Sequence, residues 1–356
     1  MISQSNSQLK NNTMSVVNVA VAVIHYKDKY LLGFRDVSQH QGNRYEFVGG
    51  KIDGNETAKQ ALIREVAEET GINIDGNTIV KLGRLHHDYG DKQVSLQVYN
   101  IELTTMQYEH HQHRRYGLEG QALTWVNKPE LLAGHYDLPA ANKTILEWLR
   151  LPIRIAITYP LAHFSAHSDR AVAWLQFHQK HLAKNAWVYI RIKETGSEKM
   201  TEQLMRSRPD IKTIVPLDDD SQKLAGNQQV IAYQLTHSTL MQWFYEIEEN
   251  VVSDQLLSSS CPLIVSCHDA DSVYAANKLA NARLVQQLPP VIGIFLSPVL
   301  ATQTHPDTTP LGWEEWSELA ALADMPVIGL GGLSPALFNQ AAQHGATSIA
   351  GIRQFS

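Results

Sequence analysis

Residues Gly49–Ile72, GGKIDGNETAKQALIREVAEETGI, carry the most informative pattern in this chain. From Gly50 the stretch fits G-x5-E-x7-R-E-U-x-E-E-x-G-U, where U is an aliphatic residue, without a departure. Agreement at so many fixed positions is not expected by chance, so we treat the stretch as one functional unit. The fixed positions are Gly50, Glu56, Arg64, Glu65, Val66, Glu68, Glu69, Gly71 and Ile72.

Local rules predict that this unit is a glycine turn followed by a helix. Gly49 and Gly50 let the backbone turn tightly and approach a ligand, because glycine has no Cβ. Thr57 and Gln60 form a capping-box pair that starts the helix, and Gly71 is typical of its end. The residues expected to face the core are Ala61, Leu62 and Val66.

Three carboxylates are expected on one face of this helix. Glu65, Glu68 and Glu69 stand at i, i+3 and i+4, so they lie together and repel one another unless a cation sits among them. Oxygen-only ligands suit Mg²⁺, and Mn²⁺ as well. An ordinary surface helix with paired charges is the alternative, but it explains neither the glycines nor the single arginine, Arg64.

The unit resembles the signature of the Nudix hydrolases, which cleave nucleoside diphosphates linked to another group. Residues 16–151 resemble the MutT-type members, which remove oxidised guanine nucleotides. Arg35 and His40 precede a run that matches E-F-P-G-G-K, with Val48 in place of the proline. The segments 119–121, EGQ, and 139–142, PAAN, match a second carboxylate and a base-reading asparagine of the family.

The resemblance implies a role for each matching residue. Arg35 would pair with phosphate oxygens, His40 would bond sugar or phosphate, and Asn142 would read the edge of 8-oxoguanine. The alternatives are a surface arginine, a solvated loop histidine and an N-cap asparagine. The segment Glu46, Phe47, Val48 and Gly49 would line the base pocket, although Phe47 could equally be a core aromatic.

The resemblance also implies a metal site and a reaction. The Mg²⁺ ligands would be the Gly49 carbonyl, Glu65, Glu68, Glu69 and Glu119. The catalytic residues would be Glu65, Glu68 and Glu69, with Glu65, Glu68 or Glu119 as the general base. Attack at the β-phosphorus would convert 8-oxo-dGTP to the monophosphate and pyrophosphate.

The histidine-rich segment 109–115 is expected to be a solvated loop rather than a second metal site.

Composition limits the class of protein. A chain of 356 residues exceeds one typical domain. The net charge of −6 does not favour stable binding to nucleic acid. No apolar run reaches the roughly 18 residues that span a membrane, and the polar start is not a secretory signal. We therefore expect a cytoplasmic protein whose two cysteines are buried free thiols.

Three segments are expected: a disordered lead over 1–14, a hydrolase domain over 15–151 and a second domain over 152–356. The hydrolase domain is predicted to be an α/β/α sandwich around a mixed sheet. Its strands are expected near 16–24, 30–34, 81–87 and 93–103, followed by a loop and another strand within 117–126 and a closing helix over 137–150. In the second, short β-rich runs alternate with helical stretches, as in a (β/α)8 TIM barrel. These runs are 153–158, 187–192, 213–217, 230–234, 262–266, 291–296, 326–330 and 348–352.

The last third of the chain resembles thiamine phosphate synthase and its TenI relatives. The resemblance rests on Ser297-Pro298, Thr302-Gln303-Thr304, Pro310-Leu311-Gly312 and the run Pro326–Leu333. Gly331 and Gly332 would form a phosphate site. The metal-binding aspartates of that family have no match at 214–217 or 234–238, and His305 replaces a lysine. We therefore interpret the barrel as degenerate or repurposed.

Two further hypotheses stay open. The hydrolase could act on diphosphates related to thiamine, as the second domain suggests. Alternatively, the barrel could be a non-catalytic module that binds a phosphorylated small ligand and steadies or regulates the hydrolase.

Overall fold

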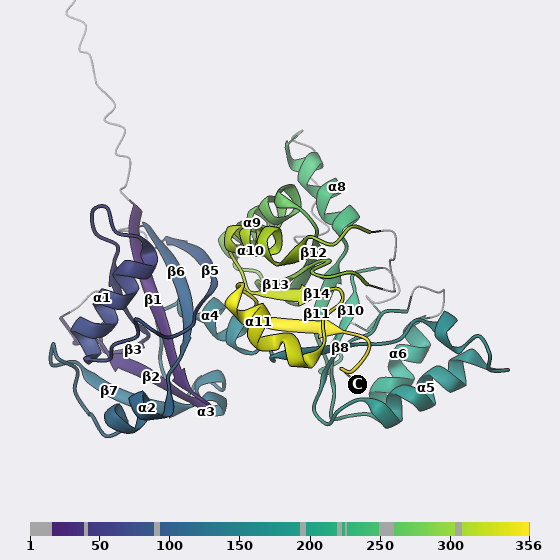
Figure 1. Ribbon diagram of the computed structural model, residues 1–356, viewed down its shortest axis with the longest axis horizontal. Helices are drawn as coiled ribbons and strands as arrows, with labels where there is room; N and C mark the ends of the chain where they lie inside the picture. The colour runs from purple at the N-terminus through teal and green to yellow at the C-terminus, as the bar shows by residue number, and fades with distance from the viewer. Residues whose placement is uncertain are drawn as a thin grey trace, which may run out of the picture.

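The computed structural model describes residues 16–38, 42–88, 93–192, 197–218, 223–224, 226–248, 260–302 and 308–355. The predicted lead, His40 and His305 lie outside these ranges. The described residues form a mixed-sheet domain beside a closed barrel (Figure 1). Among them, no helix is both long and apolar enough to cross a membrane.

The first domain is built around strand β1. Among the described residues it contains seven strands in one sheet, and β1 pairs in parallel with β6 and antiparallel with β2 and β4. The strands are β1 (Val16–Tyr26), β2 (Lys29–Phe34), β3 (Tyr45–Glu46), β4 (Val48–Lys51), β5 (Ile79–Asp88), β6 (Gln93–Glu102) and β7 (Ala122–Asn127). Strand β5 forms one edge of the sheet, next to β6.

Both faces of this sheet are covered, as the sandwich prediction requires. Alternate residues of a strand face opposite sides, and Ala20, Ala22 and Ile24 of β1 pack in one core with helix α1 (Ala58–Thr70). Val21 and Val23 face the other core, which contains helix α4 (Asn142–Leu149). Helix α1 lies on the side of the sheet away from the barrel (Figure 1).

The caps of α1 agree with the sequence. The Thr57 side chain accepts a hydrogen bond from Gln60 N, and the Gln60 side chain accepts one from Thr57 N at 2.8 Å. Gly71 closes the helix with a φ of 72°. The predicted helix start and end are therefore confirmed, which fixes the register of the carboxylates on α1.

The prediction of a solvated loop over the histidine-rich segment was wrong in part. Helix α2 (Thr105–His111) covers its first residues, because Thr104 and Gln107 form a second capping box. Arg114 then donates from Nη1 to the Thr70 carbonyl at 2.7 Å, at the end of α1. The closing helix is also shorter than predicted, since α4 begins only at Asn142, and a short helix α3 (Lys128–Leu132) precedes it.

The second domain is a closed barrel of eight parallel strands within the described residues, which confirms the (β/α)8 prediction. Its strands are β8 (Arg154–Ile157), β9 (Trp187–Tyr189), β10 (Lys212–Pro216), β11 (Val230–Leu235), β12 (Leu263–Cys267), β13 (Val291–Leu296), β14 (Val327–Leu330) and β15 (Ser348–Gly351). Its helices are η1 (Leu161–Phe164), α5 (Arg170–His181), α6 (Ser197–Ser207), α8 (His237–Glu248), α9 (Ala270–Val285), α10 (Gly312–Leu322), η2 (Pro335–Leu337) and α11 (Phe338–Gln343). Neither Cys261 nor Cys267 forms a disulfide bond; Cys267 is buried and Cys261 is half-buried.

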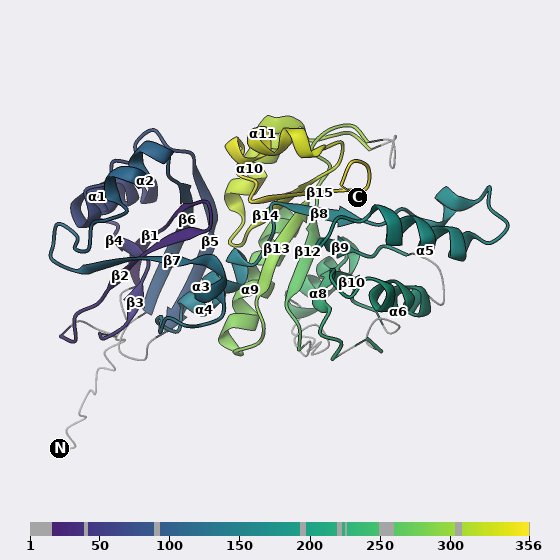
Figure 2. The ribbon, with the colours of Figure 1, turned by 90° about the horizontal axis from the view of Figure 1, so that it is seen from below.

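The two domains share one apolar core. Helix α4 lies between the sheet and the barrel (Figure 2), and its buried residues continue into those of the barrel. Trp148 donates from Nε1 to the Val291 carbonyl at 3.2 Å, and Arg84 N donates to the Asp324 carbonyl at 3.1 Å. The junction is therefore packed and hydrogen-bonded, unlike a flexible linker.

A buried histidine fixes the loop that follows the first barrel strand. His178 donates from Nδ1 to the Trp174 carbonyl at 2.8 Å and accepts from Tyr159 N at Nε2, at 3.0 Å. It is almost fully buried, and that burial lowers its pKa to about 4. Both ring nitrogens are satisfied only by the neutral imidazole.

Acid should therefore destabilise the barrel through His178. The folded pKa of about 4 lies below the unfolded 6.5, so the unfolded state binds the proton more readily between these values. His178 thus contributes stability above pH 6.5 that is lost as the pH falls. Linkage predicts a loss of about 2 kcal/mol of unfolding free energy between pH 7 and pH 5. Urea unfolding of wild type and His178→Gln at both pH values measures it, and an equal loss in the two proteins would contradict the assignment.

Candidate active site

Two glycines in the turn before α1 leave room for neighbouring groups. Gly49 has a φ of 150°, and a Cβ there would collide with the Ala20 carbonyl of β1. A Cβ at Gly50 would occupy the position of the Glu65 carboxylate. The paired glycines therefore bring the turn into direct contact with the carboxylate face of α1.

Arg64 organises the carboxylates around it. Its Nη2 donates to Glu56 Oε1 at 2.5 Å and to the Lys51 carbonyl at 3.1 Å. Its Nη1 donates to Glu65 Oε1 at 2.8 Å and to Glu68 Oε2 at 3.1 Å. The Arg64 hydrogen bond lowers the pKa of Glu56. This explains why one arginine stands among the glutamates, and it gives roles to Arg64 and Glu56, which the sequence marked only as fixed positions.

Glu69 lies at the centre of a negative region. Burial, followed by the charges of Glu46, Glu65 and Glu119, raises its pKa to about 8, and a hydrogen bond from the Gly49 backbone offsets only part of this. Glu46 and Glu119 lie far from α1 in sequence, so the fold brings them to the helix. A carboxyl group in this position would be protonated near neutral pH unless a cation balanced its neighbours.

The donor set suits a hard divalent cation, because every candidate ligand is an oxygen and the negative charges are crowded. Glu65 and Glu68 are turned toward Arg64 in this structure. Within the part of the chain that the structure describes, no three acidic, histidine or cysteine side chains converge closely enough to hold one ion. The metal ligands named from the sequence therefore stay a prediction.

Most of the predicted substrate residues lie in or next to β2, β3 and β4. Arg35 follows β2 and forms an ion pair with Glu46 of β3, with 2.7 Å between Nε and Oε2. Burial raises the pKa of Glu46, and Arg35 offsets part of this rise. Phe47 is 4% exposed and belongs to the sheet core, as the alternative for that residue proposed, and Val48 faces the α1 core.

Asn142 is not the N-cap of α4. That position is Ala141, which makes no side-chain cap bond, and Asn142 is the first helical residue. Asn142 is 7% exposed, and within the described residues its side chain makes no hydrogen bond. The segment before it is attached to β3, since Tyr45 N donates to the Asp137 carbonyl at 2.9 Å. A largely buried asparagine beside β3 is consistent with ligand binding.

Comparison with known proteins identifies the family of the first domain. The model of the NUDIX domain matches residues 19–148. CTP pyrophosphohydrolase of Escherichia coli K12 is 30% identical over 135 residues, which are 38% of this chain and 91% of that enzyme. The chain belongs to the Nudix family.

Two other relatives are named 8-oxo-dGTP diphosphatase. The 8-oxo-dGTP diphosphatase of Escherichia coli K12 is 28% identical over 138 residues, which are 38% of this chain and 98% of the relative. The 8-oxo-dGTP diphosphatase of Proteus vulgaris is 36% identical over 86 residues, which are 24% of this chain and 75% of the relative. The model of thiamine monophosphate synthase matches residues 254–355, so the barrel contains a domain of that type.

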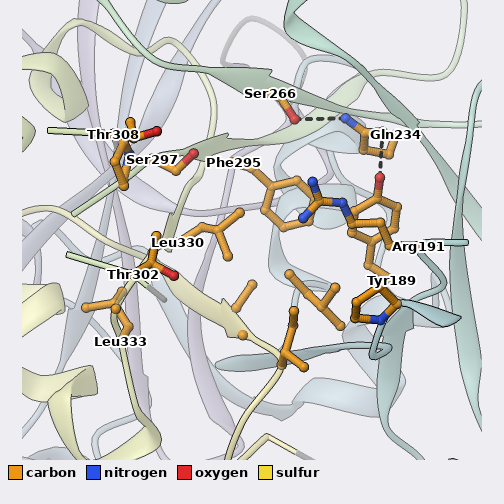
Figure 3. A pocket seen from close by; sticks show the side chains of 18 of the residues that line it. Tyr189, Arg191, Gln234, Ser266, Phe295, Ser297, Thr302, Thr308, Leu330 and Leu333 are labelled. Carbon is orange, nitrogen blue, oxygen red and sulfur yellow. Dashed lines mark hydrogen bonds between the residues drawn. The ribbon is translucent and has the colours of Figure 1, made fainter. Parts of the chain in front are cut away.

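A cavity of about 1420 Å³ lies in the barrel, away from the Nudix site. It opens at the carboxyl ends of the strands, where barrel enzymes place their active sites. Tyr189 Oη donates to Gln234 Oε1 at 2.8 Å, and Gln234 Nε2 donates to Ser266 Oγ at 2.8 Å, across its floor (Figure 3). Among the described residues that line it, the sole acidic one is Asp218.

Gly331 and Gly332 line the mouth of this cavity with φ values of 99° and 68°. A Cβ at Gly331 would lie 2.7 Å from Pro298 Cβ, and one at Gly332 would lie 2.7 Å from the Ala301 carbonyl. Packing against this neighbouring loop therefore requires both glycines. That requirement holds whether or not they bind phosphate, so the predicted phosphate site stays a prediction.

The contact between Gly50 and Glu65 yields a test. Gly50→Ala should lower kcat by about 100-fold, because the new methyl group displaces the Glu65 carboxylate from the cluster. The fold should persist, because the new methyl group collides with the end of the Glu65 side chain and not with the backbone. Gly76→Ala is the matched control, because a Cβ there meets nothing within 4 Å. Steady-state kinetics with a nucleoside triphosphate and Mg²⁺ measure the effect, and unchanged activity in Gly50→Ala would contradict it.

Proposed function

We propose that this chain hydrolyses 8-oxo-dGTP to 8-oxo-dGMP and pyrophosphate with Mg²⁺. The observation that carries the proposal is that the charges of Glu46, Glu65 and Glu119 all act on the buried carboxyl group of Glu69. The membership of the Nudix family supports pyrophosphohydrolysis, and the two relatives named 8-oxo-dGTP diphosphatase support this substrate. Clearing oxidised precursors from the nucleotide pool would limit mutation.

The residues that would hold Mg²⁺ are the Gly49 carbonyl, Glu65, Glu68, Glu69 and Glu119. Mn²⁺ suits the same donors. When bound, the ion would withdraw charge from phosphorus and lower the pKa of a bound water.

The protein's own groups orient and deprotonate the attacking water. Glu65, Glu68 or Glu119 would take its proton. Arg64 holds Glu65 and Glu68 through Nη1 and is itself anchored by Glu56, so their carboxylates have few orientations open to them. Attack at the β-phosphorus then releases pyrophosphate from the nucleoside monophosphate.

The base-reading role falls to Asn142. Guanine gains an N–H donor and a carbonyl acceptor on one edge when it is oxidised at C8, and an amide side chain can accept and donate at once. Asn142 is largely buried at the start of α4, in a segment attached to β3. Arg35, beside Glu46, supplies positive charge for phosphate oxygens.

A second candidate substrate comes from the barrel. The match to thiamine monophosphate synthase favours diphosphates related to thiamine. Asn142 and Arg35, at the positions expected of an oxidised-purine hydrolase, favour the nucleotide. For the barrel we propose binding of a phosphorylated small ligand without synthase chemistry, since Asp218 is the lone carboxylate among the described residues of its cavity.

The metal assignment predicts a large catalytic defect in Glu69→Gln. This change keeps the size of the side chain and removes its negative charge, so kcat should fall by at least about 100-fold. Thermal unfolding should stay close to wild type, and Glu130→Gln on α3 is the control for loss of one charge. If the activity of Glu69→Gln stays within about threefold of wild type, Glu69 is not a metal ligand.

The substrate assignment predicts a selective defect in Asn142→Ala. Losing both donor and acceptor leaves the facing groups of the oxidised base unpaired. The loss in kcat/KM should be larger for 8-oxo-dGTP than for dGTP, by about 1–3 kcal/mol. Asn127→Ala is the control, because it removes a hydrogen-bonded asparagine that accepts from Lys29 at 2.7 Å. Equal losses in kcat/KM for both nucleotides would show that Asn142 does not recognise the oxidised base.

A further inference from the structure

Helix α4 cannot hold its own position. It is eight residues long and has no side-chain bond at its N-cap. Isolated helices of this length are not stable in water, so packing must fix its orientation. Asn142, Thr144, Ile145, Trp148 and Leu149 are all buried, which means that α4 is enclosed by its neighbours on several sides.

One of these neighbours is the barrel. Trp148 is 3% exposed and lies between the domains, with its indole N–H on the Val291 carbonyl at the start of β13. Its ring also lies against Gly83 of β5, where a Cβ would be 2.7 Å from Trp148 Cη2. Trp148 therefore contacts both the hydrolase sheet, at Gly83, and the barrel, at Val291.

Strand β5 is held by the same part of the barrel. Its pairing with β6 shifts between Lys81 and Gly83, and a Cβ at Gly83 would lie 2.7 Å from the Asp324 carbonyl. Arg84 N donates to that carbonyl at 3.1 Å, and Lys81 Nζ donates to the Ala321 carbonyl at 2.9 Å. The barrel thus occupies the open edge of the hydrolase sheet, an edge that other chains would otherwise pair with.

The barrel side of this contact is itself braced. Asn277 of α9 accepts from Asp324 N at 2.9 Å and donates to the Leu322 carbonyl at 2.9 Å. This bond connects a barrel helix with the loop that meets β5. Support for the hydrolase therefore extends into the barrel, beyond the contact surface.

We propose that the barrel positions the base-reading helix of the hydrolase, and that Trp148 is the positioning residue through which it acts on Asn142. Six positions separate Trp148 from Asn142, which is about 9 Å along the helix at 1.5 Å per residue. A small tilt at Trp148 therefore displaces the Asn142 amide, and base recognition depends on sub-ångström placement. The inference rests on the proposed role of Asn142 in reading the base.

Two indole-to-carbonyl bonds on β13 provide a matched pair of variants. Trp148→Phe keeps an aromatic ring between the domains and removes the donor to Val291. Trp316→Phe removes an equivalent buried bond inside the barrel, from Nε1 to the Leu296 carbonyl at 3.0 Å. The two changes delete the same chemical group at opposite ends of one strand, and only the first lies against α4.

Two readouts on the full chain test the proposal. The first is the ratio of kcat/KM for 8-oxo-dGTP to that for dGTP, which should fall by about fivefold in Trp148→Phe and stay within about twofold in Trp316→Phe. The second is backbone hydrogen exchange over residues 142–149, which should speed up in Trp148→Phe alone. A ratio and an exchange rate that are unchanged in Trp148→Phe would overturn the proposal, as would equal effects in the two variants.

Failure of the proposed function gives a different result. If wild type does not discriminate between the two nucleotides, the assignment of Asn142 fails, while hydrogen exchange still decides whether the barrel holds α4. If Trp148→Phe does not fold, Asn277→Ala tests the same support from the barrel side. It should lower the kcat/KM ratio by at least about twofold, and an unchanged ratio would overturn the proposal.

Discussion

Repulsion among carboxylates is the constraint on which the hydrolase domain depends. Burial raises the pKa of Glu69 most, and the charges of Glu46, Glu65 and Glu119 raise it further. Such an arrangement persists only if the scaffold enforces it and positive charge balances it. Arg64 supplies part of that charge, and Gly50 leaves the space that the Glu65 carboxylate occupies. The rest of the sheet serves to bring distant segments to α1.

The two domains form one packed unit with two separate sites. Strand β13 begins at Val291, which bonds Trp148 at the domain junction, and ends near Phe295 and Ser297, which line the barrel cavity. The hydrolase therefore docks on the amino end of the barrel strands, and the cavity opens at their carboxyl ends. This geometry gives the barrel two separate surfaces, one that contacts the hydrolase domain and one that contains the cavity.

Short-range patterns predicted much of this architecture. The capping pair Thr57 and Gln60 and the closing Gly71 set the limits of α1, because their signals lie within a few residues of one another. The barrel strands were predicted because β-rich runs and helical stretches alternate along the chain, and each run is recognisable from its own residues. Helix α2 was missed because its histidines suggested a loop, although Thr104 and Gln107 repeat the capping-box pattern.

Long-range contacts left no comparable signal in the sequence. Gly83 looks like any strand glycine, yet it is where Asp324 and Trp148 approach β5. The position of Asn142 could not be predicted either, because the N-cap of α4 depends on how residues 137–141 turn beside β3. The shared face of the α1 carboxylates followed from spacing, whereas the candidate residues carried by other elements came from resemblance and stay a prediction.

The most direct test of the central claim is hydrolysis in ¹⁸O-labelled water by the full chain with Mg²⁺. The substrates to compare are 8-oxo-dGTP, dGTP, CTP and thiamine diphosphate. We predict the highest kcat/KM for 8-oxo-dGTP, with the label in pyrophosphate as attack at the β-phosphorus requires. A preference for CTP or thiamine diphosphate, or label in the nucleoside monophosphate, would contradict the account.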